Sequence, residues 1–354
     1  MEAVELIAVG DVSLVCPSAC DPFEHVGRYL RAGDLLFGNL ETALCSTGVT
    51  VEKEVALSVS PRQAECLSRT GFDIVSVANN HILDCGPHGL SQTLAALREH
   101  GIRFVGAGDN GSPRGYEIIE CKGLKVGFLA YCENGVSGLP NGVFVNRIDL
   151  PIMLVQLQAL KRQCDVVAVS LHWGIEYVFY PRPQQIELAR ELIRHGATLV
   201  LGHHPHVVQG IEQLDKGLIV YSLGSFQFEP RREEAKPSLI LHARISQRGV
   251  QRYRLIPVHI GDADRPLLSR NKDRRETLRL VERISAPIRE GRVTDRWWFE
   301  QAASVYLRAN FKAWATRVRK YGLRHLVQFA RWLVSRFTIK CYLGYLRAMV
   351  RQHG

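Results

Sequence analysis

Five apolar segments of the sequence each run into side chains that bind metal ions in proteins. Together they supply carboxylate, amide and imidazole groups, a set that suits borderline divalent metals such as Mn, Fe or Zn. The residues concerned are Asp11, Glu41, Asn80, His81, His172, His204 and His206. Without His81, six potential ligands remain, which is more than one tetrahedral zinc ion needs. The set therefore predicts one or two divalent metals, and two metals that share a carboxylate fit it better.

Such a pair of metals would perform chemistry at phosphorus. Two ions about 3.5–4 Å apart stabilise the attacking and leaving oxygens of a displacement. His81, next to Asn80, is predicted to stay free of metal and to protonate a leaving alkoxide. Asp84 is predicted to orient His81 by accepting a hydrogen bond. If the segment 204–206 (HPH) is extended, both of its imidazoles lie on one side, because side chains alternate along an extended chain.

Each of these residues also has a plainer explanation when it is taken alone. An Asp after a strand is commonly a turn former, and Asn79-Asn80 is a typical turn. The segment 203–206 could be a tract on the surface. Jointly, however, these explanations require five independent coincidences at one sheet edge, so the metal site is preferred. Four histidines lack such neighbours and are predicted to be structural or surface residues: His88, His100, His195 and His242.

The elements that must position the site are those of an α/β fold. Short β-branched apolar runs alternate with helical patterns, which is typical of βα units. Strands are expected at 4–9, 34–38, 73–77, 125–130, 166–170, 198–201, 218–221 and 238–245. Helices are expected over 86–100 and 182–195, the second closing on Gly196 as a C-cap. Because ligands bind outside the carboxyl ends of strands in open α/β sheets, the predicted ligands should converge at one edge.

Composition limits the class of protein. The chain has 354 residues, of which 46% are hydrophobic and 23% charged, so it is globular and long enough for one or two domains. Its nine cysteines are an odd number and include no CxxC pair, so neither a disulfide framework nor a zinc ribbon is expected. This use of cysteine favours a reducing compartment. The N-terminus shows no signal sequence, and no apolar run reaches about 18 residues. A cytoplasmic protein is expected.

The positive charge is concentrated at the C-terminal end. The chain carries a net charge of +10, but residues 262–354 carry +13 and the remainder −3. The polar segment 261–271 is the expected boundary between a domain over 1–260 and a basic, Trp-rich helical extension over 261–354. The last 54 residues contain 11 Lys and Arg and no acid, and an amphipathic helix is expected over 323–337.

Two explanations of this extension remain open. In the first, the apolar face of the extension packs on the body while its basic side chains stay solvated. In the second, the helix lies on an anionic bilayer, at the inner face of the membrane. Binding of a polyanion is less favoured because of the apolar content. Nucleic acid is not an expected partner, since no recognised nucleic-acid module occurs.

Six blocks in order link the chain to a known family. They are GDVSL (10–14), NLE (39–41), ANNHILDCG (78–86), LHWGIEY (171–177), GHHPHVVQG (202–210) and YSLGSF (221–226). With these blocks the sequence resembles the capsule-synthesis CapA proteins, which are linked to poly-γ-glutamate production and belong to the calcineurin-like metallophosphoesterase superfamily. The resemblance implies a four-layer α/β/β/α sandwich with its site at one sheet edge. It also implies metal binding by Asp11, Glu41, Asn80, His172, His204 and His206, and a catalytic role for His81.

Two positions depart from the wider pattern. Ser13 stands where other metallophosphoesterases have a histidine, and Ser225 stands where the family usually has Asn. Many members also carry a membrane anchor near the N-terminus, and none is evident here.

The expected function is that of a metal-dependent hydrolase acting on a phosphoester or related bond in capsule or poly-γ-glutamate-type polymer synthesis. The alternative is a non-catalytic accessory component that binds the anionic polymer. A metal-free structural domain is disfavoured by the ligand set.

Overall fold

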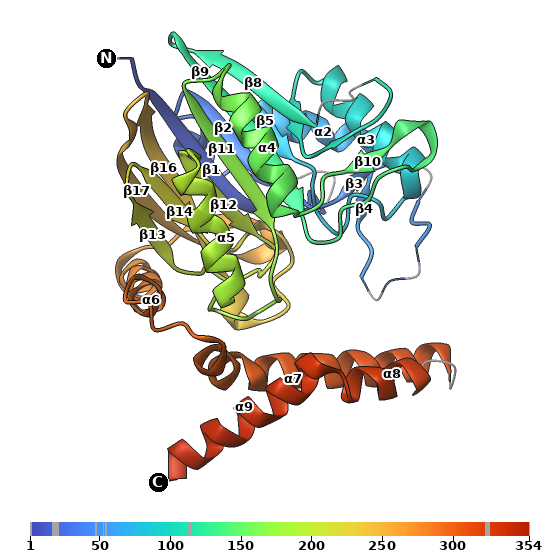
Figure 1. Cartoon of the computed structure of the whole chain (residues 1–354). Coiled ribbons are helices and arrows are strands. Elements are labelled where there is room, and N and C mark those ends of the chain that lie inside the picture. The colour runs from blue at the N-terminus through green and yellow to red at the C-terminus, as the bar shows by residue number, and fades with distance from the viewer. Residues whose placement is uncertain are drawn as a thin grey trace.

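Two β-sheets packed face to face form the centre of the computed structural model (Figure 1). The structure describes residues 2–353 apart from 16–20, 47, 52, 54, 112–114 and 323–325. The first sheet contains, in spatial order, β18 (Pro266–Leu268), β17 (Gly249–Ile260), β16 (Pro237–Ser246), β1 (Val4–Val12), β2 (Leu35–Leu40), β5 (Ile74–Ser76) and β6 (Arg103–Val105), with β15 (Ser225–Gln227) paired to β1. The second contains β13 (Ile211–Leu214), β14 (Gly217–Val220), β12 (Leu199–His203), β11 (Val166–His172), β9 (Leu124–Cys132) and β8 (Tyr116–Cys121).

All eight predicted strands are present in these sheets. Two short pairs lie outside them: β3 (Ala43–Leu44) with β4 (Ser58–Val59), and β7 (Ala107–Gly108) with β10 (Phe144–Val145). In the first sheet β1, β2, β5 and β6 run parallel, and in the second β9, β11, β12 and β14 do. Parallel strands are covered on both faces, which explains their continuous apolar runs. In each sheet the carboxyl ends of these strands lie along one edge.

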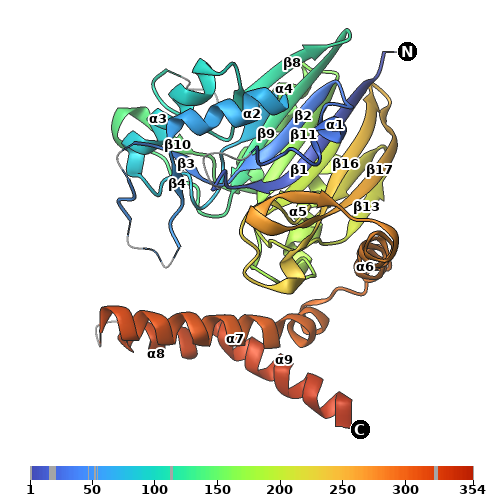
Figure 2. The same ribbon diagram turned by 180° about the vertical axis from the view of Figure 1, so that it is seen from behind.

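Helices cover the outer faces of both sheets, so the layers follow the expected α/β/β/α order. Phe37 of β2 stacks on Phe128 of β9, with ring centroids 5.9 Å apart, and marks the apolar core between the sheets. The helices α1 (Gly27–Leu30), α2 (Ala64–Thr70) and α3 (Gly86–Glu99) pack on the first sheet, seen in front in Figure 2. On the second sheet lie α4 (Leu150–Lys161) and α5 (Pro183–Arg194). As predicted, α5 is followed by Gly196 in the left-handed conformation, with φ of 101°.

The first sheet continues beyond residue 260, where the sequence predicts the end of the first domain. Strand β18 pairs with β17, and α6 (Asn271–Arg289) then lies against the body. Ser285 on this helix accepts a hydrogen bond of 2.8 Å from the backbone N–H of Ile211, and Val281 and Ile288 are buried. The division into domains stays a prediction, but these two elements pack with the sheets.

Three helices follow as an arm below the sheets: α7 (Asp295–Tyr321), α8 (Leu326–Leu333) and α9 (Arg336–His353) (Figure 1). The prediction of a single helix over 323–337 is wrong, because the helix is interrupted between α8 and α9. Residues 323–325 of the predicted helix lie outside the described part. The hydroxyl of Ser335 accepts a hydrogen bond of 3.2 Å from the backbone N–H of Thr338 and so caps the start of α9. Among the described residues, no helix has both the length and the apolar content to cross a bilayer.

The arm is attached to the body through aromatic side chains. Trp298 of α7 is buried, and its indole N–H donates a 2.8 Å hydrogen bond to the carbonyl of Tyr180. Phe337 of α9 lies 5.4 Å from Phe299 of α7, measured between ring centroids. At Gly344 of α9, a Cβ would lie 2.5 Å from the carbonyl oxygen of Phe299, so glycine permits the close approach of the two helices.

A disulfide joins Cys45 to Cys85, although the sequence predicts no disulfide framework. The two residues are 40 positions apart in sequence. Cys45 directly follows β3 and Cys85 directly precedes α3, and the fold places these two ends side by side. No local sequence motif marks such a pair. The cysteines at 16 and 20 lie outside the described residues.

Replacing both Cys45 and Cys85 by Ser is expected to lower the free energy of unfolding by about 2–4 kcal/mol, because the bond restricts a long loop in the unfolded chain. Urea denaturation with and without reductant measures the loss. The matched control is Cys66→Ser, at a free cysteine, which should leave the midpoint within experimental error. An unchanged wild-type midpoint in reductant contradicts the prediction.

Candidate metal centre

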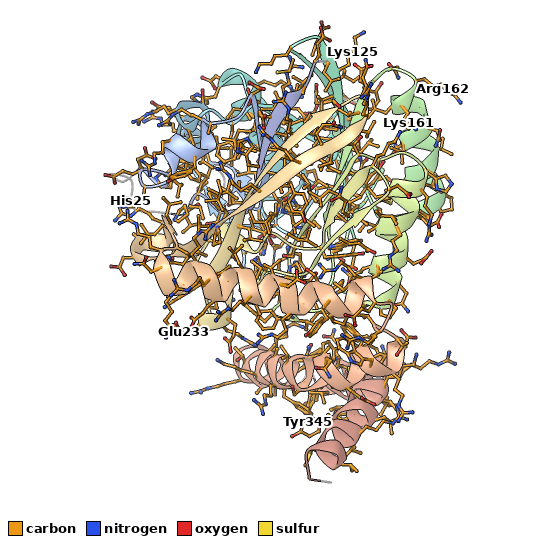
Figure 3. The ribbon with its side chains drawn as sticks, turned by 90° about the vertical axis from the view of Figure 1, so that its left-hand side faces the viewer. His25, Lys125, Lys161, Arg162, Glu233 and Tyr345 are labelled. Atoms are coloured by element: carbon orange, nitrogen blue, oxygen red, sulfur yellow. A yellow bond between two sulfur atoms is a disulfide. The ribbon has the colours of Figure 1, made fainter. Side chains whose placement is uncertain are left out.

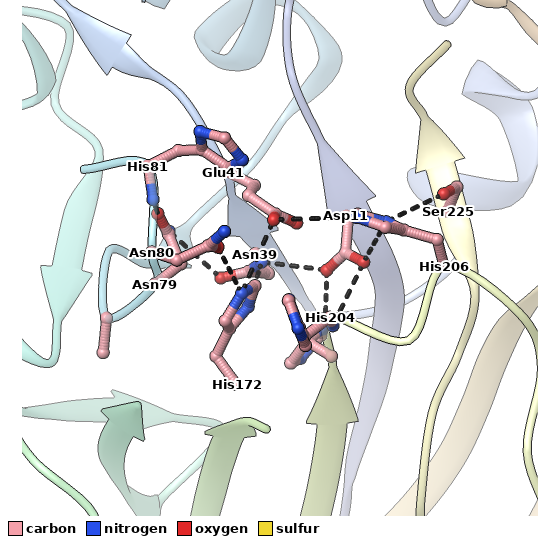
Figure 4. A network of polar contacts seen from close by, with 12 residues as sticks. Asp11, Asn39, Glu41, Asn79, Asn80, His81, His172, His204, His206 and Ser225 are labelled. Carbon is pink, nitrogen blue, oxygen red and sulfur yellow. Dashed lines mark hydrogen bonds and ion pairs between the residues drawn. The ribbon is translucent and has the colours of Figure 1, made fainter. Parts of the chain in front are cut away.

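The predicted ligands come from both sheets and meet where the parallel strands end (Figure 4). Asp11 is the penultimate residue of β1, and Glu41 directly follows β2. His172 is the last residue of β11, and the segment 204–206 follows β12. Convergence at this edge was expected from the strand pattern, and the structure shows it.

Asp11 lies at the centre of the cluster and is fully buried. One carboxylate oxygen, Oδ2, lies 3.2 Å from Nδ1 of His206 and accepts a 3.3 Å hydrogen bond from the backbone N–H of His204. The other, Oδ1, lies 3.4 Å from Nδ1 of His203. Burial alone would raise the pKa of Asp11, but hydrogen bonds and charges from His203 and His206 outweigh it and hold the pKa well below its usual value.

Glu41 is equally buried, yet neither of its carboxylate oxygens has a hydrogen-bond partner within the described structure. Its Oε1 lies 3.5 Å from Nε2 of His172 and 3.8 Å from Nε2 of His206. Burial, together with the nearby charges of Asp11 and Glu176, raises the pKa of Glu41 well above its usual value. A buried carboxylate without partners is costly, and a cation between these groups would remove that cost.

The segment 204–206 is not extended, so the predicted conformation is wrong. His204 and His206 both have left-handed backbones, with φ of 94° and 57°. Strand β12 ends at His203 and the chain bends at once. The two imidazoles nevertheless lie 6.0 Å apart between centroids, because the bend turns both toward Asp11 and Glu41. Backbone strain at such positions is typical of sites whose geometry is imposed by the surrounding fold.

Two of the imidazoles are held in the neutral form that binds metals. Burial lowers the pKa of His172 well below its usual value and that of His204 to about 4. Their rings lie 4.8 Å apart between centroids. Nε2 of His172 lies 2.7 Å from the amide oxygen of Asn80, which places Asn80 beside the same group. A neutral imidazole offers a lone pair without first losing a proton.

The potential ligand atoms form two groups that share Glu41. In one group they belong to Asp11, Glu41 and His172, and in the other to Glu41, His204 and His206; within each group they lie within 4.8 Å of one another. Carboxylate and imidazole donors suit a divalent transition metal. The residues therefore fit the predicted cofactor, and the shared carboxylate matches the predicted arrangement of two sites.

His81 and Asp84 form a separate pair beside this cluster. Nδ1 of His81 lies 2.6 Å from Oδ2 of Asp84, and the same oxygen accepts a 2.8 Å hydrogen bond from the backbone N–H of Leu57. The ammonium group of Lys53 also bonds Asp84. Burial would raise the pKa of Asp84, but the hydrogen bonds from His81 and Lys53 lower it overall. Asp84 thus fixes Nδ1 of His81, as expected, and leaves Nε2 available.

Three residues of the site were missed by the sequence reasoning. Asn39 is buried, and its amide Nδ2 lies 2.9 Å from Oδ1 of Asp11 and 3.3 Å from Nδ1 of His172, so it links the two sheets. A polar residue inside the apolar run LLFGNL was the available signal. His203 is buried against Asp11, and Lys53 reaches Asp84 from a segment with no recognisable motif.

The two serines that depart from the family pattern have different surroundings. The Ser13 hydroxyl accepts a 3.3 Å hydrogen bond from the backbone N–H of Val15, a local turn interaction. The Ser225 hydroxyl lies 3.2 Å from Nδ1 of His206. Ser225 therefore contacts a candidate ligand, whereas Ser13 supplies no imidazole to the site.

Comparison with known proteins gives a consistent picture. Residues 5–230 match the family model described as bacterial capsule synthesis protein PGA_cap. The chain is 29% identical over 253 residues to capsule biosynthesis protein CapA of Bacillus anthracis, covering 67% of this chain and 61% of that protein. It is 29% identical over 248 residues to PGA biosynthesis protein CapA of Bacillus subtilis (strain 168), covering 68% and 65%. The chain thus spans less than two thirds of the length of these relatives.

A third relative is the probable polyglutamine synthesis accessory protein Rv0574c of Mycobacterium tuberculosis, 30% identical over 209 residues that cover 54% of this chain and 55% of that protein. Among solved structures, 5'-nucleotidase from Candida albicans SC5314 aligns with a TM-score of 0.44 and 11% identity, over 80% of this chain and 58% of that chain. The protein TT1561 of Thermus thermophilus aligns with a TM-score of 0.40 and 12% identity, over 72% and 99%. Structural similarity at this level has no bearing on the site.

Proposed function

The chain belongs to the family of bacterial capsule synthesis proteins, and we propose that it is a metal-dependent hydrolase acting on a phosphoester or related bond during the synthesis of capsule or poly-γ-glutamate-type polymer. The observation that carries the proposal is the carboxylate of Glu41. It is buried, has no hydrogen-bond partner in the described structure, and is shared by two groups of potential metal ligands.

The first group would hold one divalent ion through Asp11, Glu41 and His172, with Asn80 beside it, and the second would hold another through His204 and His206 with the shared Glu41. A bound divalent metal supplies Lewis acidity and a water of lowered pKa. The amide nitrogen of Asn39 donates a hydrogen bond to Oδ1 of Asp11, and the same side chain contacts the His172 ring, so Asn39 supports residues of both sheets. This support is needed because ligands from two sheets must keep a common geometry.

His81 is the proposed general acid. With Nδ1 bonded to Asp84, its Nε2 carries the proton that the leaving oxygen needs. The oxygen of water forms a bond to phosphorus and gives up a proton to the solvent, the phosphorus–oxygen bond to the leaving group breaks, and Nε2 of His81 gives its proton to the departing alkoxide. Asp84 stays ionised because its pKa is lowered, and so it stabilises the imidazolium form of His81 before the transfer.

Metal content tests the two groups separately. Purified without chelator, the protein is expected to contain about two divalent ions per chain by elemental mass spectrometry. His172→Ala removes a ligand of the first group only and His204→Ala a ligand of the second only, so each should lose about one ion. His195→Ala, outside the cluster, is the matched control. Absence of metal after reconstitution with Mn, Fe or Zn contradicts the proposal.

A second candidate is a non-catalytic accessory role in which the site binds an anionic polymer. Ser13 favours it, because one metal would have fewer protein ligands than in other metallophosphoesterases, and the Mycobacterium tuberculosis relative is named as an accessory protein. A panel of phosphomonoesters and phosphodiesters separates the candidates. Turnover by the metal-loaded chain supports the hydrolase; a metal-loaded chain without turnover that binds poly-γ-glutamate supports the accessory role.

A further inference from the structure

The C-terminal part of the arm, from Phe311 of α7 through α8 and α9, exposes a large apolar surface. Of the sixteen large hydrophobic side chains that are exposed in the described structure, ten lie in residues 311–354. Four of them, Ile339, Leu343, Leu346 and Val350, are 45%, 46%, 57% and 74% exposed. Their spacing of four, three and four residues places them on one face of α9. We call this face the α9 stripe.

The stripe is not the side of α9 that packs on the protein. Phe337, Cys341 and Gly344 lie on another face, where α9 contacts α7, and Cys341 is fully buried there. The helix therefore has two apolar faces and uses only one of them within the described structure. In Figure 3, Tyr345 on α9 lies below the sheets.

Basic side chains border the stripe. Arg336, Lys340 and Arg347 are exposed and, at 3.6 residues per turn, form a strip between the stripe and the packed face. The last 54 residues contain 11 Lys and Arg and no Asp or Glu, so no acid in this part of the chain neutralises the strip. On α8 and just after it, the exposed Leu326, Val327 and Val334 add further apolar surface.

Two of these basic residues also line a cavity at the base of the arm. Arg336 and Lys340 line a space of about 440 Å³ together with Arg182 and the rings of Trp298 and Phe299. One acid, Asp295, also lines it. Three cations and one acid around an aromatic-lined cavity favour an anionic group such as a phosphate.

We propose that α8 and α9 bind the surface of an anionic lipid bilayer, with the α9 stripe among the acyl chains and the basic strip at the phosphate headgroups. An exposed apolar stripe flanked by cations is the pattern of helices that lie in the membrane interface. A soluble polyanion would satisfy the charges but leave the stripe in water. A second copy of this arm would cover the stripe but bring two uncompensated positive strips together.

Co-sedimentation of the full-length protein with lipid vesicles tests the proposal. Binding is expected to vesicles of phosphatidylcholine with phosphatidylglycerol and to be much weaker with phosphatidylcholine alone. The double variant Leu343→Ser with Leu346→Ser should lower the partition coefficient by about tenfold or more, because two leucines no longer leave water. Val155→Ser is the matched control, since Val155 is 71% exposed on α4 of the body.

Charge is tested by Lys340→Gln with Arg347→Gln, which should lower the partition coefficient by about 25-fold, since each basic residue near an anionic surface contributes about fivefold. Circular dichroism confirms that each variant is folded. The proposal is overturned if the stripe variant binds like wild type. It is also overturned if the protein binds soluble poly-γ-glutamate but not the vesicles. A third contradicting result is that the protein does not bind the vesicles and light scattering shows self-association that the stripe variant abolishes. None of these readouts depends on hydrolysis, so failure here is distinct from failure of the proposed function.

Discussion

Substitution of His81 by Ala is expected to lower kcat for phosphodiester hydrolysis by about 10²–10⁴-fold, the usual contribution of a positioned general acid. His81 belongs to neither group of potential metal ligands, and its Nδ1 is occupied by Asp84 at 2.6 Å. Metal content should therefore stay at the wild-type level while turnover falls. Steady-state turnover of a phosphodiester with an alkoxide leaving group, such as a dinucleotide, and elemental analysis of the same sample measure both quantities.

Two further variants separate catalysis from folding. Asp84→Asn removes the charge that orients His81 and should cost about 10–100-fold, less than the loss of His81 itself. His88→Ala replaces an exposed histidine on the nearby helix α3 and should have no effect on kcat. If His81→Ala turns over at the wild-type rate, another group protonates the leaving oxygen and the assigned role is wrong.

Glu41→Gln is expected to have the second large effect, the loss of bound metal from both groups at once. The substitution keeps the shape of the side chain but removes the charge that the two groups share. In contrast to His172→Ala or His204→Ala, which should each lose about one ion, this variant should retain almost none. Turnover should fall with the metal.

The same variant gives a stability readout that a purely structural carboxylate would not. Because Glu41 is buried without hydrogen bonds, Glu41→Gln should leave the free energy of unfolding of the metal-free protein unchanged or raise it by about 1–3 kcal/mol. Urea denaturation in chelator measures it. Glu176→Gln, at an exposed carboxylate nearby, is the matched control and should retain metal. Clear destabilisation by Glu41→Gln would show that Glu41 has a structural role that the distances do not reveal.

The α/β class, the eight strands and the edge at which the site lies were predictable from the sequence. Parallel strands buried on both faces require continuous β-branched apolar runs, and such runs are visible without a structure. Because the carboxyl ends of parallel strands share an edge, a polar residue after each run already indicates where the site is. That reasoning places Asp11, Glu41 and His172 at or just after the ends of their strands, where the structure has them, and needs only local pattern and topology.

The tertiary structure alone decided how these residues meet. Asn39 contacts Asp11 and also His172, which lies 133 positions after Asn39 in the sequence. The carboxylate of Asp11 accepts a hydrogen bond from the backbone of His204 across 193 positions. The left-handed backbones of His204 and His206 accompany such contacts, whereas the local pattern predicts an extended chain there. Packing likewise brings Cys45 to Cys85 and leaves the α9 stripe exposed. Sequence periodicity shows that a helix has an apolar face, but only the folded chain shows whether another part of the protein covers it.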